Sequence, residues 1–182
     1  MDSPAIVALL RDLVPAADVE LVPSADRQAT IYAAASQWPA LARTLRDHPD
    51  LEFNLLAEVT AADYWPREPR FEIVYVLVSI PHRLRLRLKL RLPGTDAHVA
   101  SACDIWPAAN WLEREVWDLF GIVFDSHPDP RRLLMPEDWE GFPLRKDYPV
   151  QIRKTPTSAE PLQVTAEEFR ANVARDRLTR ER

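Results

Sequence analysis

The residues best suited to chemistry lie in one stretch of the sequence, ANWLEREVWDLF, at positions 109–120. On a helix that turns 100° per residue, Glu115 falls in the middle of the apolar stripe, whereas Trp117 falls nearly opposite, between Glu113 and Arg114. A carboxylate on the core side of a helix needs a partner, because burying it unpaired costs several kcal/mol or shifts its pKa. Glu115 is therefore the first candidate for a buried ion pair or a catalytic group.

Cationic side chains follow this helix closely, at Arg131, Arg132, Arg145 and Lys146. Because a guanidinium forms bidentate hydrogen bonds with a carboxylate, we predict that one of these arginines binds Glu115. The alternative is that Glu115 acts as a general acid or base. The sequence, however, has no nucleophile, ligand cluster or second carboxylate at a supporting spacing. The outward Trp117 is covered either by the segment that follows or by a partner protein.

Other kinds of chemistry find little support in the residue types. The histidines show no pair at i, i+3 or i+4, so a helical zinc pair is not expected. His127 is interpreted as a turn residue with a satisfied ring nitrogen, and a metal ligand is the less favoured alternative. Cys103 is the only cysteine, which excludes an intrachain disulfide and a cluster bound by several thiolates of this chain. The 3 glycines provide no phosphate-binding loop. We therefore predict no catalytic, cofactor-binding or metal-binding residue in this chain.

Periodicity indicates the elements that position these residues. Apolar residues at helical spacing predict helices over 4–14, 36–47 and 107–120. Short or alternating apolar runs predict strands over 19–22, 30–34, 51–60, 71–80 and 83–92. In the strand over 51–60, the residues placed inward are Leu51, Phe53, Leu55, Ala57 and Val59. The order predicts an α+β fold, a two-layer domain of helix, two strands, helix and three strands, which ends with the 107–120 helix at residue 121.

Two strands carry further information about the sheet. Residues 71–80 are apolar on both faces, which indicates a central strand. Residues 83–92 read RLRLRLKLRL, so leucines face the core and five cations face outward. Pairing with Glu52, Glu58 and Glu72 on nearby strands is the favoured interpretation of these cations. Nucleic-acid binding and docking onto an acidic partner are the alternatives, and the net charge of −5 argues against nucleic acid.

Residues 122–182 are expected to form an extended tail that binds partners. The part up to Val150 is rich in proline and has no sustained periodicity, so it cannot be a regular helix or a central strand. It nevertheless carries many large apolar groups, which a disordered linker lacks. We predict that Trp139, Phe142, Leu144 and Tyr148 anchor it, partly on another protein. Thr165 and Glu168 resemble a capping box, which predicts a short helix over 165–178.

Three blocks of this sequence together resemble one known family. They are the approach DIWPAANWLERE from Asp104, the stretch EREVWDLFGIVFDSHPDPRRLL from Glu113 to Leu134, and EGFPLRKDYP from Glu140 to Pro149. This segment is similar to the signature of the C-type subunit of complex I, the 30 kDa subunit family of NADH:quinone oxidoreductase. The resemblance assigns structural and interface roles to Glu113, Arg114, Glu115, Trp117, Asp118, His127, Arg131, Arg132, Trp139, Phe142, Leu144, Arg145, Lys146, Asp147 and Tyr148.

The resemblance implies a function for the complex rather than for the chain. The assembled complex would transfer electrons from NADH to quinone and translocate protons, while this subunit stays structural in the peripheral arm. FMN and iron–sulfur clusters would belong to other subunits. The expected partners are the D-type subunit, which forms the quinone cavity, and the B-type and I-type subunits. The expected location is the cytoplasmic face of the bacterial inner membrane, or the matrix side in an organelle.

Three rival functions remain at this stage. The chain could be the equivalent subunit of a related complex with another electron donor, a stand-alone enzyme that uses Glu115, or a nucleic-acid binder that uses the cations between Arg83 and Arg91. The longest apolar run, Ile73 to Ile80, is far shorter than the ~20 residues of a membrane-spanning helix. Any membrane association is therefore expected to come through a partner.

Overall fold

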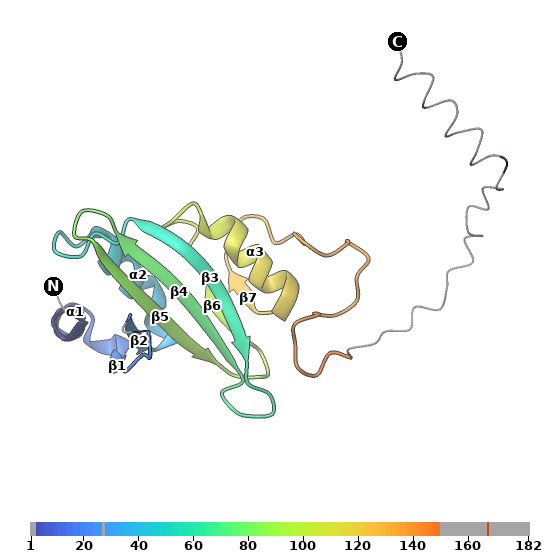
Figure 1. Ribbon diagram of the computed structural model, residues 1–182, viewed down its shortest axis with the longest axis horizontal. Coiled ribbons are helices and arrows are strands. Elements are labelled where there is room, and N and C mark those ends of the chain that lie inside the picture. The colour runs from blue at the N-terminus through green and yellow to red at the C-terminus, as the bar shows by residue number, and fades with distance from the viewer. Residues whose placement is uncertain (1–2, 27, 150–166, 168–182) are drawn as a thin grey trace, which may run out of the picture. The chain divides into compact units, whose positions relative to one another are not determined.

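The computed structural model describes residues 3–26, 28–149 and 167 (Figure 1). The helices are α1 (Ser3–Leu13), α2 (Trp38–Asp47) and α3 (Ala109–Phe120), with short 3-10 turns at Pro15–Ala17 and Ala35–Gln37. The strands are β1 (Glu20–Val22), β2 (Ala29–Ala33), β3 (Leu55–Asp63), β4 (Phe71–Ser79), β5 (Leu84–Leu92), β6 (His98–Ala100) and β7 (Val123–Asp125). The predicted α+β class and the order of elements are confirmed.

Five of the strands form one sheet with the order β1-β2-β5-β4-β3. Only β2 and β5 pair in parallel, and the other neighbours are antiparallel. The predicted central strand is confirmed, because β4 lies between β5 and β3. The alternation of β5 is confirmed as well, since Leu86, Leu88, Leu90 and Leu92 are buried. This pattern leaves one face of the sheet for the core and the other for the charged side chains.

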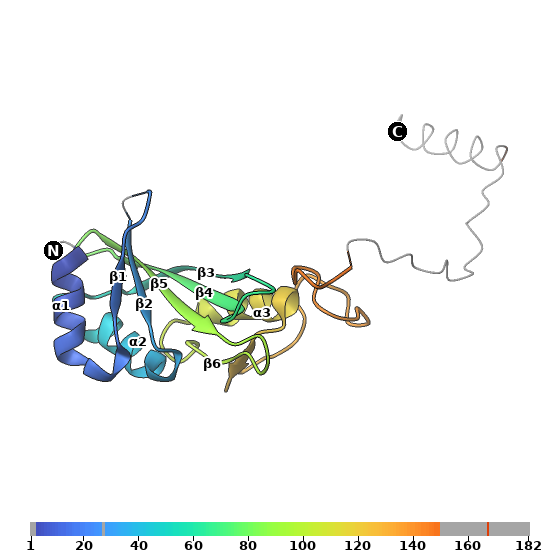
Figure 2. The same cartoon turned by 90° about the horizontal axis from the view of Figure 1, so that it is seen from below.

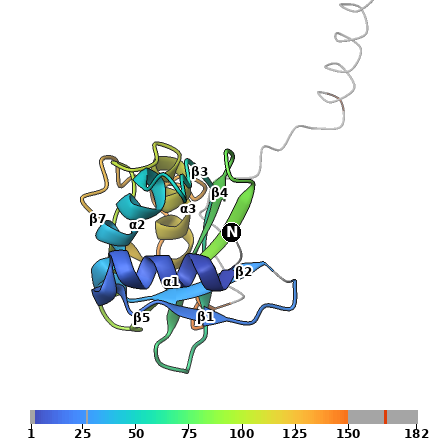
Figure 3. The ribbon, with the colours of Figure 1, turned by 90° about the vertical axis from the view of Figure 1, so that its left-hand side faces the viewer.

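The core lies between the sheet and the helices, which Figures 2 and 3 show from two further sides. Trp38 at the start of α2 stacks on Trp106 and on Tyr75 of β4, with ring centroids 6.2 and 4.1 Å apart. The indole N–H of Trp106 donates to the carbonyl oxygen of Phe53 at 2.8 Å. These wholly or nearly buried aromatic rings join α2 and β4 to the segment that precedes α3, and so fix the position of that helix.

The strand predicted over 51–60 differs from the structure in its start and its phase. It begins at Leu55, and a bulge between Leu56 and Glu58 leaves Ala57 outside the register. A bulge adds one residue to the strand, so the inward positions shift by one. Before the bulge, Leu56 faces the core in place of Leu55, which is 42% exposed, whereas Val59 after the bulge is buried as predicted. Leu51 and Phe53 are buried, as predicted, but precede the strand.

The boundary expected after residue 121 is not where the compact unit ends, since that unit continues to Pro149. Residues 123–125 form β7, which pairs in parallel with β6, a short strand that periodicity did not indicate. We call residues 126–149 the strap. The strap has no regular strand or helix, in agreement with its proline content, but it packs on the chain's own domain. The helix predicted over 165–178 lies outside the described residues, except for Glu167.

Candidate functional site

The candidate site is the surface of α3 and the strap that lies against it. The α3 helix ends at Gly121, whose φ of +70° is the left-handed conformation that closes many helices. Within α3, three charged side chains are buried, Glu113, Arg114 and Asp118. Burial of three charges on one short helix requires a partner for each polar group.

The prediction that Glu115 faces the core is wrong, because Glu115 is exposed and Glu113 is the wholly buried carboxylate. The inward stripe of α3 runs through Ala109, Glu113, Val116 and Phe120. Trp111, an apolar residue on the same face as Glu115, is 60% exposed. The apolar pattern predicted the wrong face of the helix as the inward one. The face that meets the core carries one acidic side chain and two small or medium ones, so it does not stand out as apolar.

Asp118 is the carboxylate that the strap binds. Its Oδ2 accepts hydrogen bonds from the backbone N–H groups of Leu133, Leu134 and Met135 at 2.7–3.0 Å. Its Oδ1 accepts a hydrogen bond from the Arg132 guanidinium at 2.7 Å. Burial by itself raises the pKa of Asp118, but these amides and the guanidinium outweigh it and hold the pKa below its usual value. The pair predicted between an arginine and Glu115 is therefore wrong, because Arg132 binds Asp118 and Glu115 is exposed.

Arg114 binds the same part of the strap from its other edge. Its guanidinium donates to the carbonyl oxygens of Arg131 and Arg132, both at 3.0 Å, and to the carboxylate of Asp129 at 3.3 Å. An arginine can bind several acceptors at once, because its guanidinium presents five N–H donors in a rigid plane. Arg114 and Asp118 thus satisfy carbonyl and amide groups of one short segment that forms no sheet or helix of its own.

A second attachment joins the end of the strap to the sheet. Arg70, next to β4, donates to the carboxylates of Asp63 and Asp147 with distances between 2.7 and 3.0 Å. Asp63 also accepts the backbone N–H groups of Lys146 and Trp65. Burial raises the pKa of Asp63, but the Arg70 guanidinium and these amides lower it more, to about 2. The sequence did not indicate Asp63 or Arg70, because 83 residues separate Asp63 from Lys146.

The predicted anchors of the strap divide into two groups. Phe142 packs edge-on against Trp117 and lies under the Arg132 and Arg145 guanidinium groups. Trp117 is therefore covered by the segment that follows, one of the two alternatives. The hydroxyl of Tyr148 donates to the carbonyl oxygen of Glu140. By contrast, the predicted anchor Leu144 is 50% exposed, and so it does not anchor the strap on the domain. Leu134, which was not predicted to be an anchor, is 59% exposed.

The other arginines of the strap also have partners within the domain. Arg145 donates to the carbonyl oxygens of Phe120 and Gly121, and burial lowers its pKa from the ordinary value. These carbonyls end α3 and have no partner inside the helix, so Arg145 closes its C-terminus. Arg131 forms an exposed pair with Asp129. Lys146 contributes its backbone N–H to Asp63.

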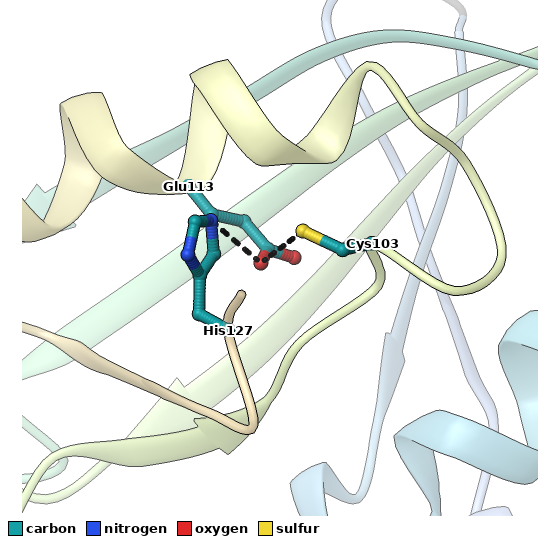
Figure 4. Close-up of side chains that lie close together, drawn as sticks. All are labelled: Cys103, Glu113 and His127. Carbon is teal, nitrogen blue, oxygen red and sulfur yellow. Dashed lines mark hydrogen bonds and ion pairs between the residues drawn. The ribbon is translucent and has the colours of Figure 1, made fainter. Parts of the chain in front are cut away.

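Figure 4 shows a cluster around the buried Glu113. The Ser101 hydroxyl and the Ala102 N–H donate to Glu113 at 2.6 and 2.7 Å, and Cys103 Sγ lies 3.6 Å from Oε2. His127 Nε2 lies 4.0 Å from the same oxygen. Burial raises the pKa of Glu113 to about 7 and that of the Cys103 thiol to about 11. The His127 side chain is only 4% exposed and lies next to Glu113, a position that the turn interpretation did not anticipate.

The row of cations on β5 is partly neutralised within the sheet. Lys89 pairs with Glu72 at 2.7 Å and Arg87 pairs with Asp26 at 2.6 Å. Arg91 stacks over the Tyr32 ring at 3.8 Å. The cross-strand pairing predicted for Glu72 is confirmed, and Asp26 is a further partner. Among the residues that the structure describes, no helix has the length and apolar character needed to cross a bilayer.

Comparisons with known proteins give this arrangement a family. The model described as respiratory-chain NADH dehydrogenase, 30 Kd subunit, matches residues 31–154. The C-type subunit of the NADH-quinone oxidoreductase of Geobacter sulfurreducens is 48% identical over 125 residues, which cover 68% of this chain and 76% of the relative. The C-type subunit of Roseiflexus castenholzii is 43% identical over 151 residues, which cover 82% and 86%.

Solved structures agree with the sequence comparison. The trypsin-resistant fragment 1–134 of Nqo5 has a TM-score of 0.60 and 29% identity, over 71% of this chain and 99% of the fragment. A chain of the membrane-bound sulfane sulfur reductase, an archaeal respiratory membrane complex, has a TM-score of 0.68 and 27% identity, over 81% and 85%. This chain therefore belongs to the family of the 30 kDa subunit of respiratory-chain NADH dehydrogenase. The predicted resemblance to the C-type subunit is confirmed.

Proposed function

We propose that this chain is a structural subunit of the peripheral arm of a proton-translocating NADH:quinone oxidoreductase and performs no chemistry of its own. In this proposal, FMN and iron–sulfur clusters held by other subunits carry electrons from NADH to quinone. The subunit lies on the cytoplasmic face of the inner membrane, or on the matrix side in an organelle, and reaches the membrane only through the complex. The names of its relatives support the assignment.

The structural role is supported by what the charged residues of α3 and the strap bind. Arg114, Asp118 and Arg132 direct their polar atoms at the chain's own backbone and at one another. In the part of the chain that the structure describes, these groups hold a loop rather than surround a space for a substrate. A loop held by buried charged hydrogen bonds keeps one shape, and a preformed shape reduces the entropy lost when a partner binds.

The surface proposed for partner binding is the exposed side of the strap. Leu134 and Leu144 are exposed there, and Trp111 of α3 is 60% exposed beside Arg114, whose guanidinium lies 5.1 Å from the ring centroid. Exposed aromatic and arginine side chains are typical of binding hot spots. We propose that this surface contacts the D-type subunit, which forms the quinone cavity, and that the B-type and I-type subunits lie next to it.

Purification of the tagged chain from its native membrane tests this function. We expect subunits that bind FMN and iron–sulfur clusters to copurify, together with a subunit of the quinone cavity. Replacing Leu134 and Leu144 by aspartate should reduce the copurified partners without unfolding the chain, because both side chains are exposed. Recovery of the chain alone, with a turnover of its own that Glu115→Gln abolishes, would instead support a stand-alone enzyme.

A second candidate is the equivalent subunit of a respiratory complex with a different electron donor. The structural similarity to a chain of the archaeal sulfane sulfur reductase supports this second candidate, because a chain with a similar fold is part of that complex. The described residues hold no feature that recognises NADH. The identity of the copurified subunits distinguishes the two candidates, since only the first requires an NADH-binding flavoprotein.

A further inference from the structure

Three potential metal ligands of different chemical types meet beneath α3. Cys103 comes from the turn that precedes α3, Glu113 from its second turn, and His127 from the start of the strap (Figure 4). Their sulfur, oxygen and nitrogen atoms all lie within 4.8 Å of one another. In the sequence the three residues show none of the usual ligand spacings, and only the fold brings them together.

We propose that Cys103, Glu113 and His127 bind one zinc ion, with a water molecule as the fourth ligand. Thiolate, carboxylate and imidazole are the three ligand types that zinc takes in proteins. Such a site differs from the expectation from the sequence, which was that no residue of this chain binds a metal, and it concerns this chain independently of the proposed function.

The distances suit a tetrahedral ion after a small movement. With Zn–S of about 2.3 Å and Zn–N and Zn–O of about 2.0–2.2 Å, neighbouring ligand atoms lie roughly 3.3–3.7 Å apart. Glu113 Oε2 is already 3.6 Å from Cys103 Sγ and 4.0 Å from His127 Nε2. The Cys103 sulfur lies within 4.8 Å of a ring nitrogen of His127, so this distance must shorten by roughly 1.5 Å at most, which side-chain rotation can supply.

A small cavity next to the cluster has room for the water ligand. Its volume is about 40 Å³, and Glu113 and His127 line it together with Trp117, Phe124 and Pro130. A water molecule needs at least about 10–15 Å³ of such space and polar partners. The ion would supply one partner and the Glu113 carboxylate another. Apart from Glu113, none of the residues that line the cavity has a side-chain oxygen or sulfur atom that could be a ligand.

The charges around the cluster favour a cation there. Glu113 is wholly buried, and its hydrogen-bond partners Ser101, Ala102 and Cys103 are all uncharged in their ordinary states. Arg114 lines the same cavity, but its guanidinium is directed at the strap. A bound ion would therefore supply the opposite charge for Glu113 and convert the Cys103 thiol to thiolate.

Binding requires a proton to move on His127. In the described state Nδ1 accepts the Asp129 N–H, and Nε2 lies 3.1 Å from the carbonyl oxygen of Asn110 as its donor. Coordination through Nε2 moves the ring proton to Nδ1 and exchanges both hydrogen bonds for the metal bond. The Cys103 thiol loses its proton, and so does Glu113 where it is protonated. Affinity should therefore rise with pH.

Titration of the purified full-length chain with Co²⁺, a spectroscopic substitute for zinc, tests the site. We expect saturation at one equivalent, with a near-ultraviolet thiolate-to-cobalt band, and displacement of that band by Zn²⁺. Cys103→Ser should abolish the band, and Glu113→Gln should weaken binding by at least about tenfold. His98→Ala is the matched control and should change neither, since His98 lies in an exposed cluster with Asp96 and Asp125.

Two outcomes would overturn the proposal. One is the absence of a thiolate band in a folded wild-type chain at several equivalents of Co²⁺. The other is unchanged stoichiometry and affinity in Glu113→Gln, which would mean that the ion binds elsewhere. If Cys103→Ser fails to fold, His127→Gln provides the second variant, because it removes one ligand and leaves the thiol. Circular dichroism of each variant separates a loss of ligand from a loss of structure.

Discussion

Arg114 and Asp118, one turn apart on α3, bind opposite edges of the same peptide segment. Arg114 donates to the carbonyl oxygens of residues 131 and 132, and Asp118 accepts the amide protons of residues 133–135. The two side chains thus replace the backbone pairing that a strand would provide. A proline-rich segment, which forms no regular ladder, is held in one conformation by this means.

Replacing Asp118 by asparagine should lower the free energy of unfolding by about 3 kcal/mol. The amide keeps the size of the side chain but leaves Arg132 without a charge to bind. It also places N–H donors next to one or more backbone donors. Urea denaturation followed by tryptophan fluorescence measures the effect. Glu115→Gln is the control, because Glu115 is exposed. A change in the free energy of unfolding of more than about 0.5 kcal/mol in this control would show that the effect is not specific to Asp118.

Glu113 should make stability depend on pH in the opposite direction to Asp63 and Asp118, whose pKa values lie below the usual range. Its folded pKa of about 7 exceeds the ordinary 4.5. The folded state therefore binds a proton more tightly, and this contribution is full below pH 4.5 and is lost as the pH rises to about 7. From pH 5 to pH 8 the wild-type chain should lose on the order of 2–3 kcal/mol more than Glu113→Gln. Urea titrations with EDTA present, to exclude metal, measure this difference, and parallel curves would contradict it.

The pair formed by Arg70 and Asp147 should protect the end of the strap from proteases. Lysine keeps the charge of Arg70 but cannot bind Asp63 and Asp147 with one planar fork. Arg70→Lys should therefore release residues 145–149 more often and accelerate tryptic cleavage after Arg145 and Lys146 severalfold. Mass spectrometry of a digestion time course measures the rates. Arg85→Lys, at an exposed position of β5, should digest like the wild-type chain.

Assembly should distinguish two adjacent arginines of the strap. The Arg132 guanidinium binds Asp118 and the carbonyl oxygens of Trp139 and Gly141, whereas the Arg131 side chain is 74% exposed. If the proposed function holds, Arg132→Ala should reduce the amount of this chain in the purified complex. Arg131→Ala should reduce it little. Equal recovery of both variants would show that the conformation of the strap does not matter for assembly.

Much of the fold could be predicted from local patterns. The leucine alternation of β5 and the two apolar faces of β4 depend only on which side of a strand meets the core, so the residues themselves report it. The end of α3 follows from Gly121, whose backbone preference acts locally, whereas the helix begins at Ala109, two residues after the start predicted at Pro107. The phase of β3 escaped prediction because a bulge at Ala57 depends on pairing with β4.

Residue types and their spacing were enough to predict that α3 carries buried charge and that a proline-rich, aromatic segment follows it. The contacts between distant segments were needed to show that Glu113 and Asp118 are the buried acids and that Glu115 is exposed. The reason is that apolar periodicity describes one contact face, whereas α3 meets the core on one side and the strap on another. A partner that lies far away in the sequence, as Asp147 does from Arg70, leaves no local pattern.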